Sequence, residues 1–370
     1  MYAYDGLNRK LEEAGIGKTR LSKELKISSR TIAKIARGEK LSSRVLQKIA
    51  AYFQCQPEEL CREISANPLL QQLREEKDAR ISGGMIEHNL MVAHAKALHL
   101  YKTMGLKGKI GIVHTLEGKV PITDTPENRH ARDLDDAMSN RFMLDACFLG
   151  KYSDETMALI DEILRENNGT LVTEPSDFDD FAVAAKEIDF LGMNYYSSHF
   201  LQAWDGESKV FNNSTGEKGT SVFALHGVGA RVSNPEVPTT DWDWPIYPQG
   251  MHDQLCRIAH DYPNYHEIFI SENGMGYKDD LVDGKIDDTP RIEYVAKHLR
   301  AIQQAIAEGV NVRGYYIWSL QDMLSWSNGY NKRYGLFYVD YETQKRTPKK
   351  SAYWYKLCSE QKRIVPVGEV

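Results

Sequence analysis

Four short apolar segments, separated by segments with helical patterns, constrain the fold of this chain more than any other feature. The apolar segments are residues 108–116, 187–196, 267–271 and 312–320. The predicted helices are residues 88–104, 126–150, 154–166, 247–260, 290–308 and 350–362. Strands that are joined through helices pair in parallel, so the chain from residue 85 onward is predicted to be an α/β protein with a parallel sheet. A glycine-rich stretch from Gly206 to Gly229 is predicted to be a long loop.

The first 64 residues follow a different pattern, with short helices and no strand signal. Ser28 and Ser29 precede the apolar Ile32 and Ile35 at a position typical of a helix N-terminus, and Gly38 closes that helix. We therefore predict that this part of the chain is a small all-α domain.

Charge also divides the chain into two parts. Residues 1–50 hold 12 Lys and Arg against 5 Asp and Glu, whereas the rest of the chain holds 34 against 47. A basic head on an acidic body indicates two parts with different partners. We predict a helical domain over 1–64, a polar linker over 65–84 and an α/β domain over 85–370.

Several protein classes are disfavoured by composition. There is no run of 18 apolar residues, and the N-terminus lacks the basic, apolar and small-residue succession of a signal peptide. The five cysteines are an odd number, widely scattered, and form no CxxC pair. We therefore expect a cytoplasmic protein with reduced thiols, no membrane contact, no disulfide framework and no zinc site.

Polar and aromatic residues lie at the C-terminal ends of three of the predicted strands. Glu272 ends the third strand, Asn194 and Tyr196 lie at the end of the second, and Trp318 lies at the end of the fourth. Catalytic groups of α/β barrels lie at the C-terminal ends of strands, so these side chains are predicted to share one mouth. The alternatives are that Glu272 is a helix-capping or loop acid and that Tyr195 and Tyr196 are core residues at a strand end.

Longer motifs around these strand ends carry a family resemblance. Three strings, Ser271-Glu272-Asn273-Gly274, Gly192-Met193-Asn194-Tyr195-Tyr196 and Trp318-Ser319-Leu320-Gln321-Asp322, closely resemble glycoside hydrolase family 1. The segment from Ser325 to Leu336, SWSNGYNKRYGL, resembles the 6-phospho-β-galactosidases of that family. The stretch TTDWDWPIYP from Thr239 to Pro248 fits as well. The resemblance extends over roughly residues 88–370 and implies a retaining (β/α)8 glycosidase without metal or other cofactor.

The resemblance also implies roles for individual residues. Glu272 would be the nucleophile that forms a glycosyl-enzyme intermediate, and Tyr196 would donate a hydrogen bond to it. Asn194 would lie near the nucleophile and the sugar, and Trp318 would form the floor under the sugar ring.

The same resemblance implies a site for a sugar phosphate. Ser325, Lys332 and Tyr334 match the triplet that holds the 6-phosphate, and one ammonium group with two hydroxyls suits a dianion. Trp326 occupies the position of a bulky aromatic in galactose-type enzymes, which favours galactose over glucose. Without the surrounding string, Lys332-Arg333 would be interpreted as a solvated basic pair.

The chain departs from the family in one respect that matters for catalysis. A retaining glycosidase needs a second carboxyl group as acid and base, which this family carries in a Thr-x-Asn-Glu-Pro-like string after barrel strand four. No such string is present. The sequence therefore predicts an incomplete TIM (β/α)8 barrel with strands five to eight only. Such a half-barrel exposes two strand edges and is expected to self-associate or to bind a complementing half-barrel.

The basic head has a resemblance of its own. Residues 18–39 resemble the helix-turn-helix of Cro/repressor-type regulators, with residues 28–37 as the recognition helix in the major groove of duplex DNA. The side chains expected to face bases are Ser29, Arg30 and Lys34, and those expected to contact phosphates are Lys18, Arg20 and Arg37. A small helical bundle that contacts another protein is the alternative.

Three functions remain open from the sequence. The first is a β-glycoside hydrolase of 6-phospho-β-galactosidase type, acting on phosphorylated galactosides such as lactose 6-phosphate in carbohydrate catabolism and crippled by loss of its acid/base half. The second is a DNA-binding transcriptional regulator whose half-barrel binds a sugar phosphate. The third is an inactive fusion fragment.

Overall fold

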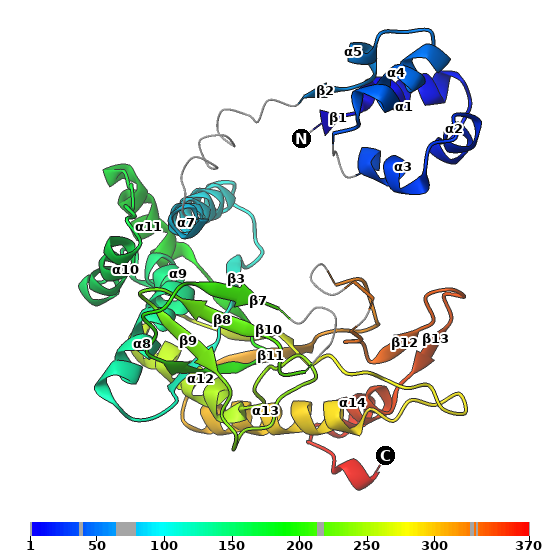
Figure 1. Cartoon of the computed structure of the whole chain (residues 1–370). Coiled ribbons are helices and arrows are strands. Elements are labelled where there is room, and N and C mark those ends of the chain that lie inside the picture. Colours follow the sequence, from blue (N-terminus) through cyan, green and yellow to red (C-terminus); the bar gives the residue numbers. More distant parts are fainter. Residues whose placement is uncertain are drawn as a thin grey trace. The chain divides into compact units, whose positions relative to one another are not determined.

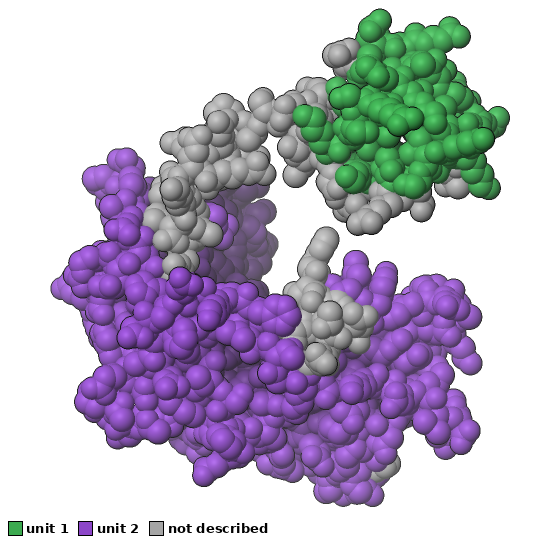
Figure 2. All heavy atoms as spheres, in the orientation of Figure 1, with its two compact units in different colours: residues 1–82 green, residues 83–370 purple. Residues whose placement is uncertain are grey.

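The computed structural model of the chain divides it into two compact units, Met1–Ser82 and Gly83–Val370 (Figure 2). The structure describes residues 2–36, 40–63, 79–212, 218–325, 329–330 and 332–369. Within them, no helix is both long enough and apolar enough to span a bilayer.

The first unit is a cluster of five short helices. They are α1 (Asp5–Glu13), α2 (Lys18–Glu24), α3 (Ser29–Ala36), α4 (Ser43–Tyr52) and α5 (Pro57–Leu60). The expectation that this part has no strands was wrong, because β1 (Tyr2–Ala3) pairs antiparallel with β2 (Arg62–Glu63). Two-residue strands are too short to show an alternating pattern in the sequence.

Local sequence explains where these helices begin and how they pack. The Ser28 hydroxyl accepts a hydrogen bond from the Thr31 amide at 3.2 Å, which caps α3. Buried leucines and isoleucines from every helix form one core, namely Leu7, Leu11, Leu21, Ile35, Ile49 and Leu60. The predicted helical domain is therefore held together by its own hydrophobic core.

The second unit is built around a parallel sheet of four strands. These are β3 (Gly111–Thr115), β5 (Phe190–Asn194), β10 (Ile268–Asn273) and β11 (Val312–Ile317), in the order β11-β10-β5-β3. All neighbouring pairs are parallel, so the four predicted strands and their direction are confirmed.

Helices precede, connect and follow these strands (Figure 1). They are α7 (Ala79–Thr103), α8 (Pro126–Asp136), α9 (Phe142–Leu144), α10 (Asp154–Glu166), α11 (Pro175–Glu187), α12 (Pro248–Asp261), α13 (Thr289–Ala307) and α14 (Lys350–Gln361). Two π-helical turns, η1 (Ala137–Arg141) and η2 (Asp145–Leu149), interrupt the helix predicted over 126–150, and a short 3-10 helix, η3 (Val367–Glu369), follows α14. Helix α7 begins inside the segment predicted as a linker, so the loop signal of Ser82-Gly83-Gly84 was overridden there.

A second sheet has three strands in or at the end of the region that was predicted to be a long loop, and two strands outside it. Its strands are β4 (Gly118–Pro121), β6 (Ser198–Gln202), β7 (Lys209–Phe211), β8 (Val222–Leu225) and β9 (Gly229–Val232), in the order β4-β6-β9-β8-β7. The loop prediction was wrong because its glycines mark turns: Gly219 and Gly227 have φ values of 85° and 68° and lie between antiparallel strands. A small hairpin, β12 (Phe337–Val339) with β13 (Arg346–Pro348), completes the unit.

The two faces of the parallel sheet differ sharply. On one face, Leu191, Met193 and Ile270 are fully buried against helices that include α12 and α13. On the other, Val113 is 51% exposed and Tyr316 is 58% exposed. Parallel sheets normally have both faces covered, so this open face is unusual.

Candidate active site

The C-terminal ends of three parallel strands bring the predicted residues together. Glu272 pairs in register with Asn194 of β5, and Asn273 pairs with Ile317 at the end of β11. The Trp318 amide then donates to the Asn273 carbonyl at 2.9 Å. Side chains far apart in the sequence therefore meet at one edge, because the sheet is parallel.

Glu272 has a specific hydrogen-bond donor. The Tyr196 hydroxyl donates to the Glu272 carboxylate, and beside it Ser271 donates to the Asn194 side-chain oxygen at 2.8 Å. Burial, and then this bond to a carboxylate, raise the pKa of Tyr196. The hydroxyl therefore stays protonated and remains a donor at neutral pH.

Asn273 fixes the backbone next to Glu272 and was not identified as a site residue from the sequence. It is fully buried, and its side-chain nitrogen donates to the Tyr195 carbonyl at 2.7 Å and to the Tyr294 hydroxyl at 3.1 Å. Its oxygen accepts from the Tyr315 hydroxyl at 2.7 Å. A Cβ at the following residue, Gly274, would lie 1.9 Å from the Trp318 carbonyl oxygen, so only glycine fits that approach.

Two tryptophans connect this carboxylate to the predicted phosphate-binding loop. The Trp244 ring lies 5.6 Å from the Tyr196 ring and 6.4 Å from the Tyr334 ring, measured between centroids. The Lys332 ammonium lies 4.1 Å from the centroid of Trp242. Neither tryptophan was predicted as a site residue, although the string Trp242-Asp243-Trp244 was a signal that could have indicated one.

Lys332 and Tyr334 are buried, whereas a solvated basic pair would be exposed. Lys332 has an exposed fraction of 0% and Tyr334 of 6%, and burial lowers the pKa of Lys332 to about 8. Arg333 donates to buried Asp322 at 2.8 Å. Ser325 forms reciprocal backbone hydrogen bonds with Gly329, at 2.9 and 2.8 Å. Trp326 lies outside the described residues.

Asp322 fixes the backbone of the segment that carries Lys332 and Tyr334. It accepts hydrogen bonds from the Gly335 amide at 2.9 Å and from the Lys349 ammonium at 2.7 Å. Arg291, also fully buried, donates to the Arg333 carbonyl at 2.9 Å. Lys332 and Tyr334 therefore flank a backbone that buried ion pairs fix in place.

A cavity of about 440 Å³ is lined by Tyr196, the hydrogen-bond donor to Glu272, and by two carboxylates, Glu117 and Asp243. Its lining includes Tyr196, Trp242 and Trp244, and also Glu117, which follows β3. Burial opposes ionisation of Glu117, but the charges of Lys119 and Arg231 and the neighbouring His199 lower its pKa well below 4.5. Glu117 is therefore ionised at neutral pH and cannot donate a proton as a general acid.

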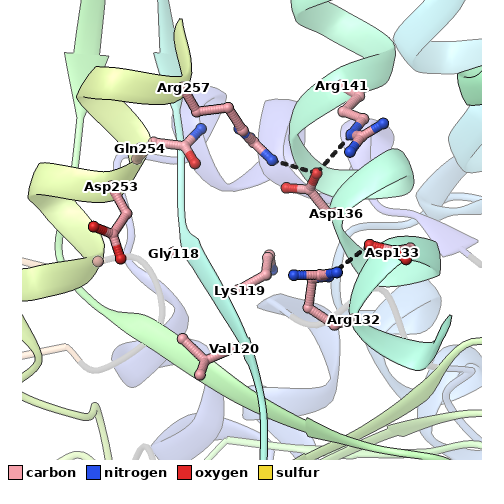
Figure 3. A pocket seen from close by; sticks show the side chains of 11 residues that line it. Gly118, Lys119, Val120, Arg132, Asp133, Asp136, Arg141, Asp253, Gln254 and Arg257 are labelled. Atoms are coloured by element: carbon pink, nitrogen blue, oxygen red, sulfur yellow. Dashed lines mark hydrogen bonds and ion pairs between the residues drawn. The ribbon is translucent and has the colours of Figure 1, made fainter. Parts of the chain in front are cut away.

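A smaller cavity, of about 260 Å³, lies between β4, α8 and α12 (Figure 3). Its lining contains none of the predicted site residues. Arg141 and Arg257 both reach Asp136 there, as Figure 3 shows. The charges around this cavity are thus largely paired with one another.

The predicted DNA-contacting residues lie on α2 and α3 of the first unit. Lys18 opens α2, and Arg20 on the same helix donates to Glu24 at 2.7 Å. Ser29, Arg30 and Lys34 lie on α3. Arg37 lies outside the described residues.

Two separate parts of the chain match known protein families. Residues 77–364 match the Glycosyl hydrolase family 1 profile, and residues 6–64 match the Cro/C1-type HTH DNA-binding domain. The 6-phospho-β-galactosidase of Clostridium acetobutylicum is 62% identical over 283 residues, which are 76% of this chain and 60% of that protein. The 6-phospho-β-galactosidase of Streptococcus equi subsp. zooepidemicus is 55% identical over 279 residues, 75% of this chain and 59% of that protein.

Solved structures of β-glucosidases are also similar to the second unit of this chain. A family 1 β-glucosidase from Thermotoga maritima has a TM-score of 0.64 at 31% identity, covering 76% of this chain and 57% of that chain. A β-glucosidase from Exiguobacterium marinum has a TM-score of 0.63 at 31% identity, covering 74% and 57%. The chain thus spans about 60% of the length of the curated relatives that it matches.

Proposed function

The chain belongs to glycosyl hydrolase family 1 through residues 77–364, and from that membership we propose that it carries the nucleophile half of a retaining 6-phospho-β-galactosidase. The observation that carries this proposal is one series of contacts. It leads from Glu272 through Tyr196 and Trp244 to Tyr334, with Lys332 against the adjacent Trp242.

The proposed chemistry follows from these groups. The Glu272 carboxylate attacks the anomeric carbon of a 6-phosphogalactoside, and the bond from that carbon to the leaving oxygen breaks with its electron pair on the oxygen. The Tyr196 hydroxyl keeps Glu272 oriented. Lys332, Ser325 and Tyr334 bind the phosphate as one cation and two hydroxyls, and Trp318 forms the floor of the sugar site with Asn194 near the nucleophile.

The second carboxyl group is proposed to be absent from this chain. Glu117 is a glutamate that lines the cavity next to Tyr196, but its lowered pKa keeps it ionised. A general acid typically contributes about 10²–10⁴-fold, and its contribution vanishes for leaving groups that depart without a proton. We therefore expect cleavage of activated aryl 6-phosphogalactosides only, unless the missing half is supplied.

The barrel is proposed to consist of strands five to eight, which are β3, β5, β10 and β11. Support comes from the open face of the sheet, on which Val113 and Tyr316 are half exposed, and from the extent of the match to the relatives. We propose that a complementing half-barrel or a second copy of this chain covers that face. The cytoplasm is the proposed compartment, because all five cysteines are free thiols.

Complementation tests this function. The full chain is mixed with a polypeptide carrying the part of the Clostridium relative that this chain lacks, and hydrolysis of lactose 6-phosphate, whose leaving group needs a proton, is measured. We expect activity in the mixture and none with Glu272→Gln. No activity from the mixture, when both polypeptides are folded and associated, would reject the proposal.

The N-terminal domain supports a second candidate function. It is a Cro/C1-type helix-turn-helix domain, and residues 1–50 carry a net positive charge. We propose that it binds duplex DNA through Lys18, Arg20, Ser29, Arg30, Lys34 and Arg37, so that the chain acts as a regulator. Affinity for duplex DNA should fall with increasing salt, and an absence of binding at low salt would remove this candidate.

A further inference from the structure

Three side chains with metal-ligating atoms converge on the outside of the second unit, on α12 and just after α13. His252 and Cys256 lie one turn apart on α12, and Glu308 follows the end of α13. The His252 Nε2 lies 3.0 Å from one Glu308 oxygen and 3.6 Å from the Cys256 sulfur. The sulfur lies 3.4 Å from the other Glu308 oxygen, and all the ligand atoms lie within 4.8 Å of one another.

The two separations that involve the sulfur agree with a tetrahedral metal site, whereas the 3.0 Å between His252 Nε2 and Glu308 is a hydrogen-bond distance that would lengthen on metal binding. Bonds to zinc of about 2.3 Å from sulfur and about 2.0–2.2 Å from nitrogen and oxygen place tetrahedral ligand atoms roughly 3.3–3.6 Å apart. The positions i and i+4 put His252 and Cys256 on the same face of α12. One histidine, one cysteine and one carboxylate leave a fourth position for water.

The surroundings of His252 also suit a metal ligand. Its other ring nitrogen, Nδ1, lies 2.9 Å from an oxygen of Asp253, and Gln249 donates to that same oxygen at 2.7 Å. A carboxylate on the far nitrogen fixes the ring orientation and makes Nε2 the coordinating atom, as in many zinc sites. The Gln304 side chain donates at 3.2 Å to Glu308 Oε1, the same oxygen that lies next to His252 Nε2.

We propose that His252, Cys256 and Glu308 bind a divalent cation of the zinc type, which joins α12 to the end of α13. Cys256 releases its thiol proton to solvent on binding. The expectation of no zinc site rested on the absence of a CxxC pair, and these ligands come from two helices that are separated in the sequence. The site is distinct from Glu272 and from the Lys332 loop, so it does not depend on the proposed hydrolase function.

Cobalt titration of the full chain tests this site. Co²⁺ replaces Zn²⁺ as a spectroscopic probe, and a thiolate ligand gives an intense near-ultraviolet charge-transfer band that Zn²⁺ should abolish by displacement. We expect one equivalent to bind, and Zn²⁺ to raise the melting temperature of the second unit. Cys256→Ser should remove the band, and Glu308→Gln, which removes a direct ligand, should weaken binding by at least the roughly 10–100-fold that loss of an outer-shell partner costs, without disturbing the core, since Glu308 is exposed.

Two matched variants separate this site from other thiols and histidines. Cys358→Ser removes another half-buried thiol, and His260→Ala removes a second histidine of α12 that also pairs with a neighbouring aspartate, Asp261, at 2.7 Å. Both variants should retain the band and the affinity. Absence of a thiolate band in the unchanged protein, or its persistence in Cys256→Ser, would overturn the proposal.

Discussion

Replacing Lys332 with methionine should make the protein more stable and should also weaken its binding of the sugar phosphate. Lys332 is fully buried, and burial lowers the pKa of its ammonium group from 10.5 to about 8. Holding this charge in the folded state therefore costs roughly 3 kcal/mol at neutral pH. Methionine removes that cost and loses the contacts of the ammonium group, among them a cation–π contact with Trp242 worth about 0.5–2 kcal/mol. We expect a net gain of roughly 1–3 kcal/mol, which is several degrees in Tm.

The difference in stability between the unchanged protein and Lys332→Met should depend on pH in a definite direction. Between pH 8 and 10.5 the unfolded chain holds the Lys332 proton and the folded chain does not, so the unfolded state binds more protons. The free energy of unfolding of the unchanged protein should therefore rise relative to Lys332→Met across this window. Below pH 8 the lysine is charged in both states, so the difference between the two proteins should be constant.

Binding should change in the opposite direction from stability. Charge-assisted hydrogen bonds contribute about 1.5–3 kcal/mol, so Lys332→Met should weaken binding of galactose 6-phosphate roughly 10–150-fold. Thermal unfolding and calorimetric titration with galactose 6-phosphate measure both effects. Lys345→Met, at an exposed turn lysine, is the matched control and should change neither. A Lys332→Met protein that is less stable, or that binds the phosphate unchanged, would refute this reasoning.

Three further substitutions test the site and its support. Tyr196→Phe removes the donor to Glu272 and should slow formation of a glycosyl-enzyme intermediate about 10–100-fold, measured by mass spectrometry over time, with Tm nearly unchanged; unaltered kinetics would contradict the assigned role. Gly274→Ala places a Cβ 1.9 Å from the Trp318 carbonyl and should lower Tm strongly, in contrast to Gly368→Ala, where no atom lies within 4 Å. Lys349→Met leaves the buried carboxylates of Asp279 and Asp322 without one cation and should cost about 3–5 kcal/mol in denaturant unfolding, whereas exposed Lys356→Met should cost little.

The parallel sheet was predictable because each of its strands is an apolar run between helical patterns. Leu191, Ile268 and Ile270 are buried as that pattern requires. The second sheet was not predictable in the same way. Its strands are short and only partly buried, with Val210 and Phe211 exposed, so glycine content dominated the pattern.

Sequence motifs identified Glu272 and Tyr196, but only the structure showed the residues that hold them in place. Asn273 acts through bonds to Tyr195, Tyr294 and Tyr315, and no spacing in the sequence indicates which hydroxyl meets which amide. The contact between Lys332 and Trp242 likewise joins two loops that are distant in the chain. Contacts of this kind depend on the three-dimensional arrangement of several strands and loops, which spacing in the sequence does not reveal.

The central claim, that this chain carries a working nucleophile half, is tested most directly by covalent trapping. The full chain is incubated with a 2-fluoro-6-phosphogalactoside that has a good aryl leaving group, and the protein is analysed by intact and peptide mass spectrometry. The account predicts one adduct, on Glu272, that is lost in Glu272→Gln and reduced in Lys332→Met. A folded protein that acquires no adduct, or acquires one on another residue, would contradict the account.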